Sequence, residues 1–119
     1  MPIEIDNVAL AANNIDEMVV FYNAVLDTQL KQYEPFPNFI SFKGKLGKLD
    51  FVVVSNEIAQ VQAAQNRQQF QFIVDDVAET IETALANGGS LIDEAAERGG
   101  RISGAVYDPD GNSMVFVQR

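Results

Sequence analysis

The chain has 119 residues, of which 47% are apolar, so it is long and apolar enough to form one folded domain rather than a disordered chain. It contains no cysteine and no histidine, which excludes disulfides, thiolate metal sites and every catalytic triad that depends on an imidazole. The 17 acidic and 8 basic side chains give a net charge of −9, which argues against nucleic acids and anionic membranes as partners and is weakly compatible with a cationic ligand.

The first predicted element is a strand over residues 7–12 that runs into an amphipathic helix. Apolar side chains from Ile15 to Leu26 recur at helical spacing and form one continuous stripe. Asn14 is placed to cap this helix, and Glu17, three residues on, is placed to complete a capping box. Three short strand-like segments, broken by proline and glycine, then follow at about 29–34, 38–43 and 49–55.

The second half of the chain has the same order of elements. A strand at about 69–74 leads into a helix that begins at Val77, is capped by Asp76 and ends before Gly88. Eleven residues from Asn7 align with eleven from Gln69 at a constant offset of 62, which marks an internal repeat. Three strand-like segments again follow, at about 90–94, 101–107 and 113–118.

The repeat divides the chain into two modules, each with the order β-α-β-β-β. Neither half, at about 60 residues, would bury enough surface to be comfortably stable alone, so we expect the modules to share a core. The join between them is rich in alanine and glutamine and is expected to form a short helical turn. We therefore treat residues 1–119 as a single domain, with module one at about 1–55, a linker at 56–67 and module two at about 68–119.

Alternation along the strands predicts which side chains face the helices. Phe51 and Phe72 belong to sets that suit packing under a helix. Asp50, Gln69 and Gln71 fall on the opposite face of their strands. Because burying an unpaired amide or carboxylate costs about 1–3 kcal/mol, these polar groups are expected to line a wet cleft or to pair with one another.

Three motifs carry a resemblance to a known family. They are Ile5-Asp6-Asn7-Val8-Ala9-Leu10 followed by Phe21-Tyr22-Asn23-Ala24-Val25-Leu26, then Phe72-Ile73-Val74-Asp75-Asp76-Val77, and Asp108-Pro109-Asp110-Gly111-Asn112 before the last strand. In this combination the chain resembles the vicinal oxygen chelate superfamily, which includes glyoxalase I, bleomycin-resistance proteins and extradiol dioxygenases. The resemblance implies an α+β fold of two tandem β-α-β-β-β modules that form a curved sheet around a cleft. It also implies dimers, with clefts at or near the subunit interface.

In the metal enzymes of that superfamily, four ligands come from the first and last strands of each module, usually His, Glu, His and Glu. Carried over by the resemblance, these positions hold Asn7, Asp50, Gln69 and Val115. The last strands of the two halves superpose at an offset of 65, which pairs Asp50 with Val115. A valine cannot bind a metal and two amides bind weakly, so we expect no catalytic transition metal and no cofactor.

Without a metal, we expect a protein that binds a small molecule in its cleft, with antibiotic (bleomycin-like) sequestration as the specific form. The negative charge has the right sign for such a cationic ligand. A loop aromatic, Phe39, is a candidate wall of the cleft. The expected ligand-binding cleft is lined by Asn7, Asp50, Gln69, Gln71, Phe39 and Val115.

Two other functions stay open. One is a metal-independent lyase or isomerase with Asp50 as the base and Tyr107 or Ser103 as a proton donor, although a lone aspartate with a pKa of about 3.9 is a poor base at neutral pH. The other is a non-catalytic interaction module, which a cleft collapsed by apolar side chains would favour. Plain structural roles also stay open: Asp50 paired with a nearby cation, and the lysines of residues 43–48 in a solvated turn.

Partners and location follow from the same features. We expect a homodimer that binds no nucleic acid and no membrane. No apolar run approaches the roughly 20 residues of a membrane span. Acidic Glu4 and Asp6 stand where a signal peptide would carry positive charge, so we expect a cytoplasmic protein.

Overall fold

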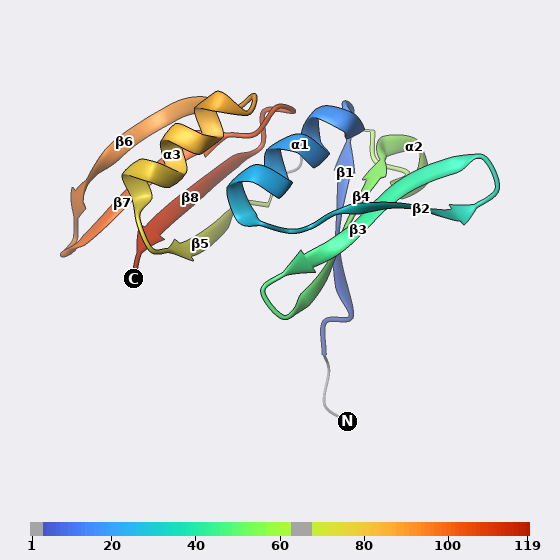
Figure 1. The fold of residues 1–119 in the computed structure, drawn as a ribbon, viewed down its shortest axis with the longest axis horizontal. Helices are drawn as coiled ribbons and strands as arrows, with labels where there is room; N and C mark the ends of the chain where they lie inside the picture. The colour runs from blue at the N-terminus through green and yellow to red at the C-terminus, as the bar shows by residue number, and fades with distance from the viewer. Residues whose placement is uncertain (1–3, 63–67) are drawn as a thin grey trace.

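Two four-stranded sheets, one from each half of the chain, carry the fold (Figure 1). The structure is a computed structural model that describes residues 4–62 and 68–119. Residues 63–67 of the predicted linker lie outside the described residues. The elements of the first half are β1 (Asn7–Ala12), α1 (Ile15–Leu26), β2 (Lys31–Phe36), β3 (Phe39–Leu46), β4 (Leu49–Ser55) and the short α2 (Asn56–Ala59).

The second half has the same arrangement without a counterpart of α2. In each sheet the first strand of the half pairs in parallel with the last strand, and the remaining pairs are antiparallel. The strand orders are β1-β4-β3-β2 and β5-β8-β7-β6. The predicted α+β fold with two β-α-β-β-β modules is therefore confirmed. The elements of the second half are β5 (Phe70–Val74), α3 (Val77–Ala86), β6 (Ser90–Arg98), β7 (Arg101–Tyr107) and β8 (Ser113–Gln118).

One hydrophobic core runs through both modules beneath the two long helices. Phe21 of α1 and Phe116 of β8 are fully buried in the same cluster, together with Val53 of β4 and Val77 of α3. The cluster joins the helix-facing side of both sheets, as the alternation of the strands predicts. We call the opposite side of each sheet its open face.

The start of α1 differs from the prediction. Asn14 makes no side-chain capping bond, so the expected cap by Asn14 is wrong. Asp110, in the turn before β8, instead accepts hydrogen bonds from the backbone N–H of Asn13 (2.7 Å) and of Asn14 (3.2 Å). A carboxylate from module two therefore fixes the turn into the first helix. In α3 the predicted cap is confirmed, since Asp76 accepts a bond from the backbone N–H of Glu79.

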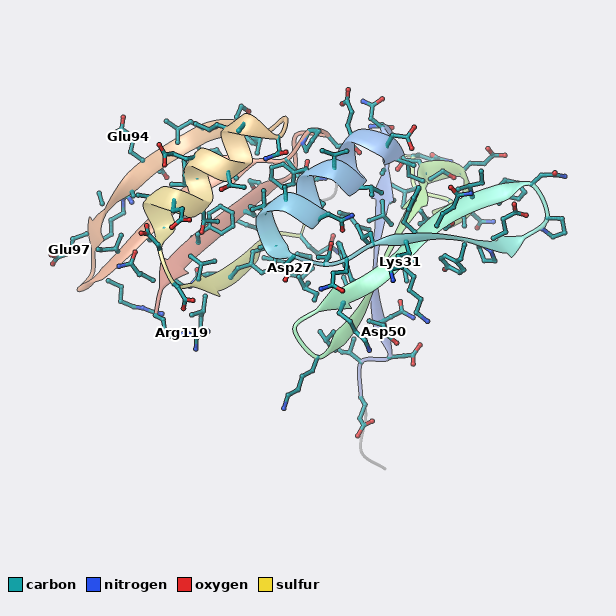
Figure 2. The ribbon with its side chains drawn as sticks, viewed as in Figure 1. Asp27, Lys31, Asp50, Glu94, Glu97 and Arg119 are labelled. Carbon is teal, nitrogen blue, oxygen red and sulfur yellow. The ribbon has the colours of Figure 1, made fainter. Side chains whose placement is uncertain are left out.

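Two strands extend beyond their predicted ends. β3 continues through Gly44 because this glycine allows the α1–β2 loop to approach closely: a Cβ at Gly44 would overlap the Thr28 carbonyl oxygen, which accepts a bond from Lys45 N. β6 continues to Arg98, where Gly99 and Gly100, both with positive φ, form a tight hairpin with β7. β6 is exposed along almost its whole length, and Figure 2 shows Glu94 and Glu97 projecting from it.

Among the described residues, no helix is both long enough and apolar enough to cross a bilayer.

Candidate functional site

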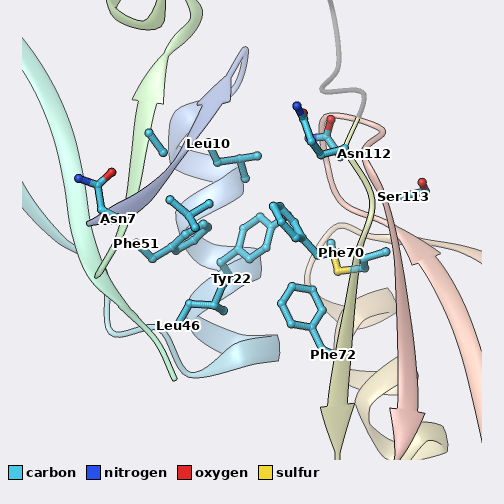
Figure 3. A pocket seen from close by; sticks show the side chains of 13 residues that line it. Asn7, Leu10, Tyr22, Leu46, Phe51, Phe70, Phe72, Asn112 and Ser113 are labelled. Atoms are coloured by element: carbon cyan, nitrogen blue, oxygen red, sulfur yellow. The ribbon is translucent and has the colours of Figure 1, made fainter. Parts of the chain in front are cut away.

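An apolar cavity of about 290 Å³ lies where the two modules meet, among side chains that face the helices (Figure 3). One wall consists of Leu10 and Phe51 from the first sheet. The other consists of Phe70 and Phe72 from β5, and the ring of Tyr22 from α1 lies between the two walls. Apolar lining with several aromatic rings is typical of small-molecule pockets, although this cavity is at the lower end of their size range.

A few polar side chains border this apolar cavity. Figure 3 shows Asn7 on β1 at one side of the rings and Asn112 at the other. Gln68 and Ser113 also line the cavity, and the Ser113 hydroxyl accepts a hydrogen bond from Gln69. The pocket therefore offers side-chain amides at more than one edge of a largely apolar space. Such groups orient a ligand that carries hydrogen-bonding atoms.

A buried hydrogen-bond network holds Asn112, which lines the pocket, in place. Asp108 is 2% exposed. Its Oδ2 accepts bonds from the Tyr22 hydroxyl (2.8 Å) and from Asn112 Nδ2 (2.9 Å). Its Oδ1 accepts bonds from the backbone N–H of Asp110 (3.0 Å) and of Asn112 (2.9 Å). The carboxylate thus ties α1 of module one to the turn of module two, and the Tyr22 hydroxyl donates its proton to it.

Burial decides the ionisation of this pair. Burial raises the pKa of the Asp108 carboxyl, and the hydrogen bonds from Asn112, Tyr22 and Asp110 lower it by less. Burial also raises the pKa of the Tyr22 hydroxyl, and the nearby charge of Asp108 adds to this effect. Tyr22 therefore stays protonated at any ordinary pH. Both groups serve the structure of the pocket wall.

The first two predicted site residues lie side by side on the open face of the first sheet. Asn7 of β1 is directly opposite Asp50 of β4, and Asn7 also lies at the edge of the cavity. The Nδ2 of Asn7 donates to Asp6 (2.9 Å), and Lys45 Nζ donates to Asp50 (2.6 Å). The hydrogen bond and charge of Lys45 lower the pKa of the Asp50 carboxyl. Asp50 therefore pairs with a nearby lysine, which was the structural alternative to a role in ligand binding or catalysis.

The predicted residues of module two lie on the open face of the second sheet. Gln71 of β5 is directly opposite Val115 of β8. Gln69, just before β5, donates from Nε2 to the Ser113 hydroxyl (2.9 Å). Strand pairing therefore brings Val115 beside Gln71 and Ser113 beside Gln69. None of these three predicted residues, Gln69, Gln71 and Val115, lines the cavity.

Phe39 is not brought to the other predicted site residues. It begins β3 and pairs with the end of β2. Lys45, the partner of Asp50, is six residues further along β3, which at about 3.3 Å per residue separates the two positions by roughly 20 Å. Phe39 therefore lies toward the opposite end of the first sheet from Asn7 and Asp50.

Sequence reasoning missed the residues that line the cavity. The alternation of β4 and β5 assigned Phe51 and Phe72 to the helix-facing side, which is correct, but periodicity alone does not reveal that the two modules leave space between these side chains. The motif from Asp108 to Asn112 predicted only a turn. The two aspartates of this turn accept hydrogen bonds from module one. Their presence in the motif was the available signal that the turn also links the two modules.

The residues at the superfamily's metal positions do not fit a metal. Asp50 is engaged by Lys45, Gln69 by Ser113, and Val115 has no donor atom. Within residues 4–62 and 68–119 no three histidine, cysteine, aspartate or glutamate side chains form a group suited to a metal ion. We therefore derive no chemistry through a metal.

The fold and the cavity define a class of protein: paired β-α-β-β-β modules with a small-molecule-sized space between them. A family model for the glyoxalase-like domain matches residues 7–117. The chain belongs to this family, and the resemblance to the vicinal oxygen chelate superfamily is confirmed. Comparison with curated protein sequences finds no match.

Solved structures of similar fold support this assignment. A glyoxalase/bleomycin resistance protein/dioxygenase family enzyme from Burkholderia phytofirmans PsJN has a TM-score of 0.78 at 19% identity, with 98% of each chain covered. The fosfomycin resistance protein FosX from Listeria monocytogenes has a TM-score of 0.76 at 14% identity, covering 100% of this chain and 93% of FosX. TnmS3, an antibiotic-binding protein from Streptomyces sp. CB03234, has a TM-score of 0.73 at 16% identity, covering 99% and 98%. At these identities the likeness concerns the fold.

Proposed function

We propose that the chain binds a small, largely apolar molecule in the cavity between its modules, without a metal ion. The observation that carries the proposal is the lining: rings of Tyr22, Phe51 and Phe70 surround a space that is bordered by a few side-chain amides. A ring-bearing molecule with hydrogen-bonding groups at its edge complements this lining. A formed cavity also disfavours the alternative of a plain interaction module, which would need that space to be filled.

We further propose that the natural ligand is an antibiotic or a chemically similar product. Two of the similar structures are named as an antibiotic-binding protein and as a fosfomycin resistance protein. A cationic, bleomycin-like ligand is less well supported than an apolar one, because no acidic side chain is among the described residues that line the cavity. The net charge of −9 is thus no guide to the ligand.

A neutral fluorescent probe tests the cavity. N-phenyl-1-naphthylamine is apolar and aromatic, and we expect it to bind with saturation. Phe70→Ala removes one wall and should weaken binding by about tenfold, in line with the loss of a large aromatic contact. Ile73→Ala is the matched control, because Ile73 is also exposed on β5 but faces the other side. Equal affinities of the two variants would contradict the proposal.

The enzymatic alternative gains no support from its candidate base. The Asp50 side chain is half-buried, and Lys45 lowers its pKa rather than raising it. A carboxylate becomes a weaker base as its pKa falls. Its suggested partners, Tyr107 and Ser103, belong to β7 of the other sheet. We therefore do not propose catalysis by Asp50.

A homodimer and a cytoplasmic location stay predictions. The exposed apolar side chains favour a second copy of the chain as the partner. Ile73 is 56% exposed and Tyr107 is 41% exposed, and both belong to the open face of the second sheet. Leu91 and Ile92 of β6 are exposed as well. Exposed apolar side chains are common at protein contact surfaces.

A further inference from the structure

Lysines concentrate on the open face of the first sheet. Lys31 of β2 is directly opposite Lys43 of β3, and Lys45 lies two residues further along the same face. These are three of only 8 basic side chains in a chain with 17 acidic ones. Figure 2 shows Lys31 and Asp50 over this sheet, whereas Glu94 and Glu97 lie along β6 of the other module. The three lysines therefore form a local basic patch, with Asp50 and Asp27 as its acidic neighbours.

The three lysines are neutralised to different degrees, and the charge of Lys43 also helps to lower the pKa of the Asp50 carboxyl. Lys45 is neutralised by its ion pair with Asp50 at 2.6 Å. Among the residues that the structure describes, Lys31 and Lys43 form no ion pair. Like charges directly opposite each other across two strands destabilise a sheet. Lys31 and Lys43 therefore repel each other, and an anion bound between them would relieve this repulsion.

A buried hydroxyl belongs to the same face. Ser41 is directly opposite Tyr33 and two residues from Lys43, so strand alternation places its side chain on the same face as the lysines. The side chain is completely buried, and its Oγ has no hydrogen-bond partner. An unsatisfied buried hydroxyl costs free energy that a plain apolar residue would not. Because this hydroxyl is fully covered in the unliganded protein, its use by a ligand requires the side chains over it to move aside.

We propose that Lys31, Lys43 and the Ser41 hydroxyl bind a small doubly charged oxyanion of the phosphate or phosphonate class. Two unpaired ammonium groups match two negative charges, and lysine binds phosphate groups as a point charge. The hydroxyl supplies a donor to one oxygen of the anion. This site lies on the opposite side of the first sheet from the apolar cavity, so it goes beyond the function proposed above and does not depend on it.

Titration calorimetry of the full-length protein with inorganic phosphate, at constant ionic strength, tests the site. Wild-type protein should show saturable binding, and methylphosphonate should bind in the same way. Acetate, with a single charge, should bind more weakly. Lys31→Gln and Lys43→Gln should each weaken phosphate binding by about tenfold, the effect expected for loss of one charge-assisted bond. Lys48→Gln, in the adjacent turn, is the matched control and should change nothing.

Ser41→Ala separates ligand binding from structure. Removing the unpartnered hydroxyl should leave the melting temperature of the phosphate-free protein unchanged or higher. The same variant should weaken phosphate binding severalfold. Weaker binding with an unchanged or higher melting temperature supports the site, and unchanged affinity overturns the role of Ser41.

Three results would overturn the proposal as a whole. The first is absence of saturable phosphate binding to the wild-type protein. The second is an equal loss of affinity in Lys48→Gln, which would show only a general charge effect. The third is a change of oligomeric state in Lys31→Gln and Lys43→Gln. That result would show that the lysines contact acidic side chains of a second copy of the chain.

Discussion

Asp108 links the two modules through the hydrogen bonds of its carboxylate. Its carboxylate accepts bonds from a helix of module one and from the turn of module two, and it is almost fully buried. A buried acceptor that loses a donor costs free energy because water cannot replace the donor. The packing of the two modules therefore depends on polar groups as well as on the apolar core.

Tyr22→Phe tests this dependence. It removes one donor from Asp108 and keeps the ring, so we expect the free energy of unfolding to fall by about 1–2 kcal/mol. Tyr107→Phe is the matched control. Tyr107 is 41% exposed, and its loss of a hydroxyl should change stability by less than about 0.5 kcal/mol. Chemical denaturation measures both, and equal effects would show that the Tyr22–Asp108 bond contributes nothing.

The raised pKa of Asp108 predicts a pH dependence with a definite sign. The folded protein binds this proton more tightly than the unfolded chain, whose carboxyl titrates near 3.8. The stability from Asp108 is therefore fully present below that value and is lost as the pH rises through the folded pKa. We expect the difference in free energy of unfolding between wild type and Asp108→Asn to favour wild type more at about pH 4 than at about pH 8. The reverse trend would contradict the assignment of burial as the dominant cause.

At the scale of elements, the sequence predicted the number, order and type of the long helices and strands. Periodicity in the 15–26 and 77–86 segments and glycine-rich breaks carried that prediction. The prediction of strand ends failed where tertiary contacts determine them. β3 passes through Gly44 because a loop approaches there, and β6 extends to a glycine turn. The site was predicted less well. Strand alternation gives the face of a side chain but not the space left between two modules.

The start of α1 yields a test at this scale. Asp110→Ala removes the acceptor for two backbone N–H groups and should lower the free energy of unfolding by about 1 kcal/mol, as loss of a helix cap does. Asn14→Ala should have little effect, because the Asn14 side chain makes no capping bond. If Asn14 capped the helix, as the sequence alone predicts, Asn14→Ala would lower the free energy of unfolding more than Asp110→Ala. Thermal or chemical denaturation of the two variants distinguishes these outcomes.

At the scale of the whole molecule, the two faces of the sheets differ in what they pack against and in which side chains they expose. The helix-facing sides form one core and leave a cavity between the modules. The open faces differ in character: lysines gather on the first, whereas exposed Ile73 and Tyr107 belong to the second. The net charge of −9 hides this division, which is why composition alone pointed toward a cationic ligand.

The apolar open face predicts the oligomeric state. Size-exclusion chromatography with light scattering should give the mass of a dimer, about twice the 13.1 kDa of one chain. Ile73→Lys places a charge on the exposed face and should shift the protein toward monomer without loss of fold. A wild-type monomer at high concentration would contradict the predicted dimer.

The most direct test of binding between the modules uses methionine methyl signals. Met114 lines the cavity, whereas Met18 is fully buried in the core and does not line it. We expect N-phenyl-1-naphthylamine, added to protein labelled at the methionine methyl groups, to shift the Met114 signal and leave the Met18 signal in place. A Met114 signal that stays unchanged while the probe binds to saturation would contradict the central claim.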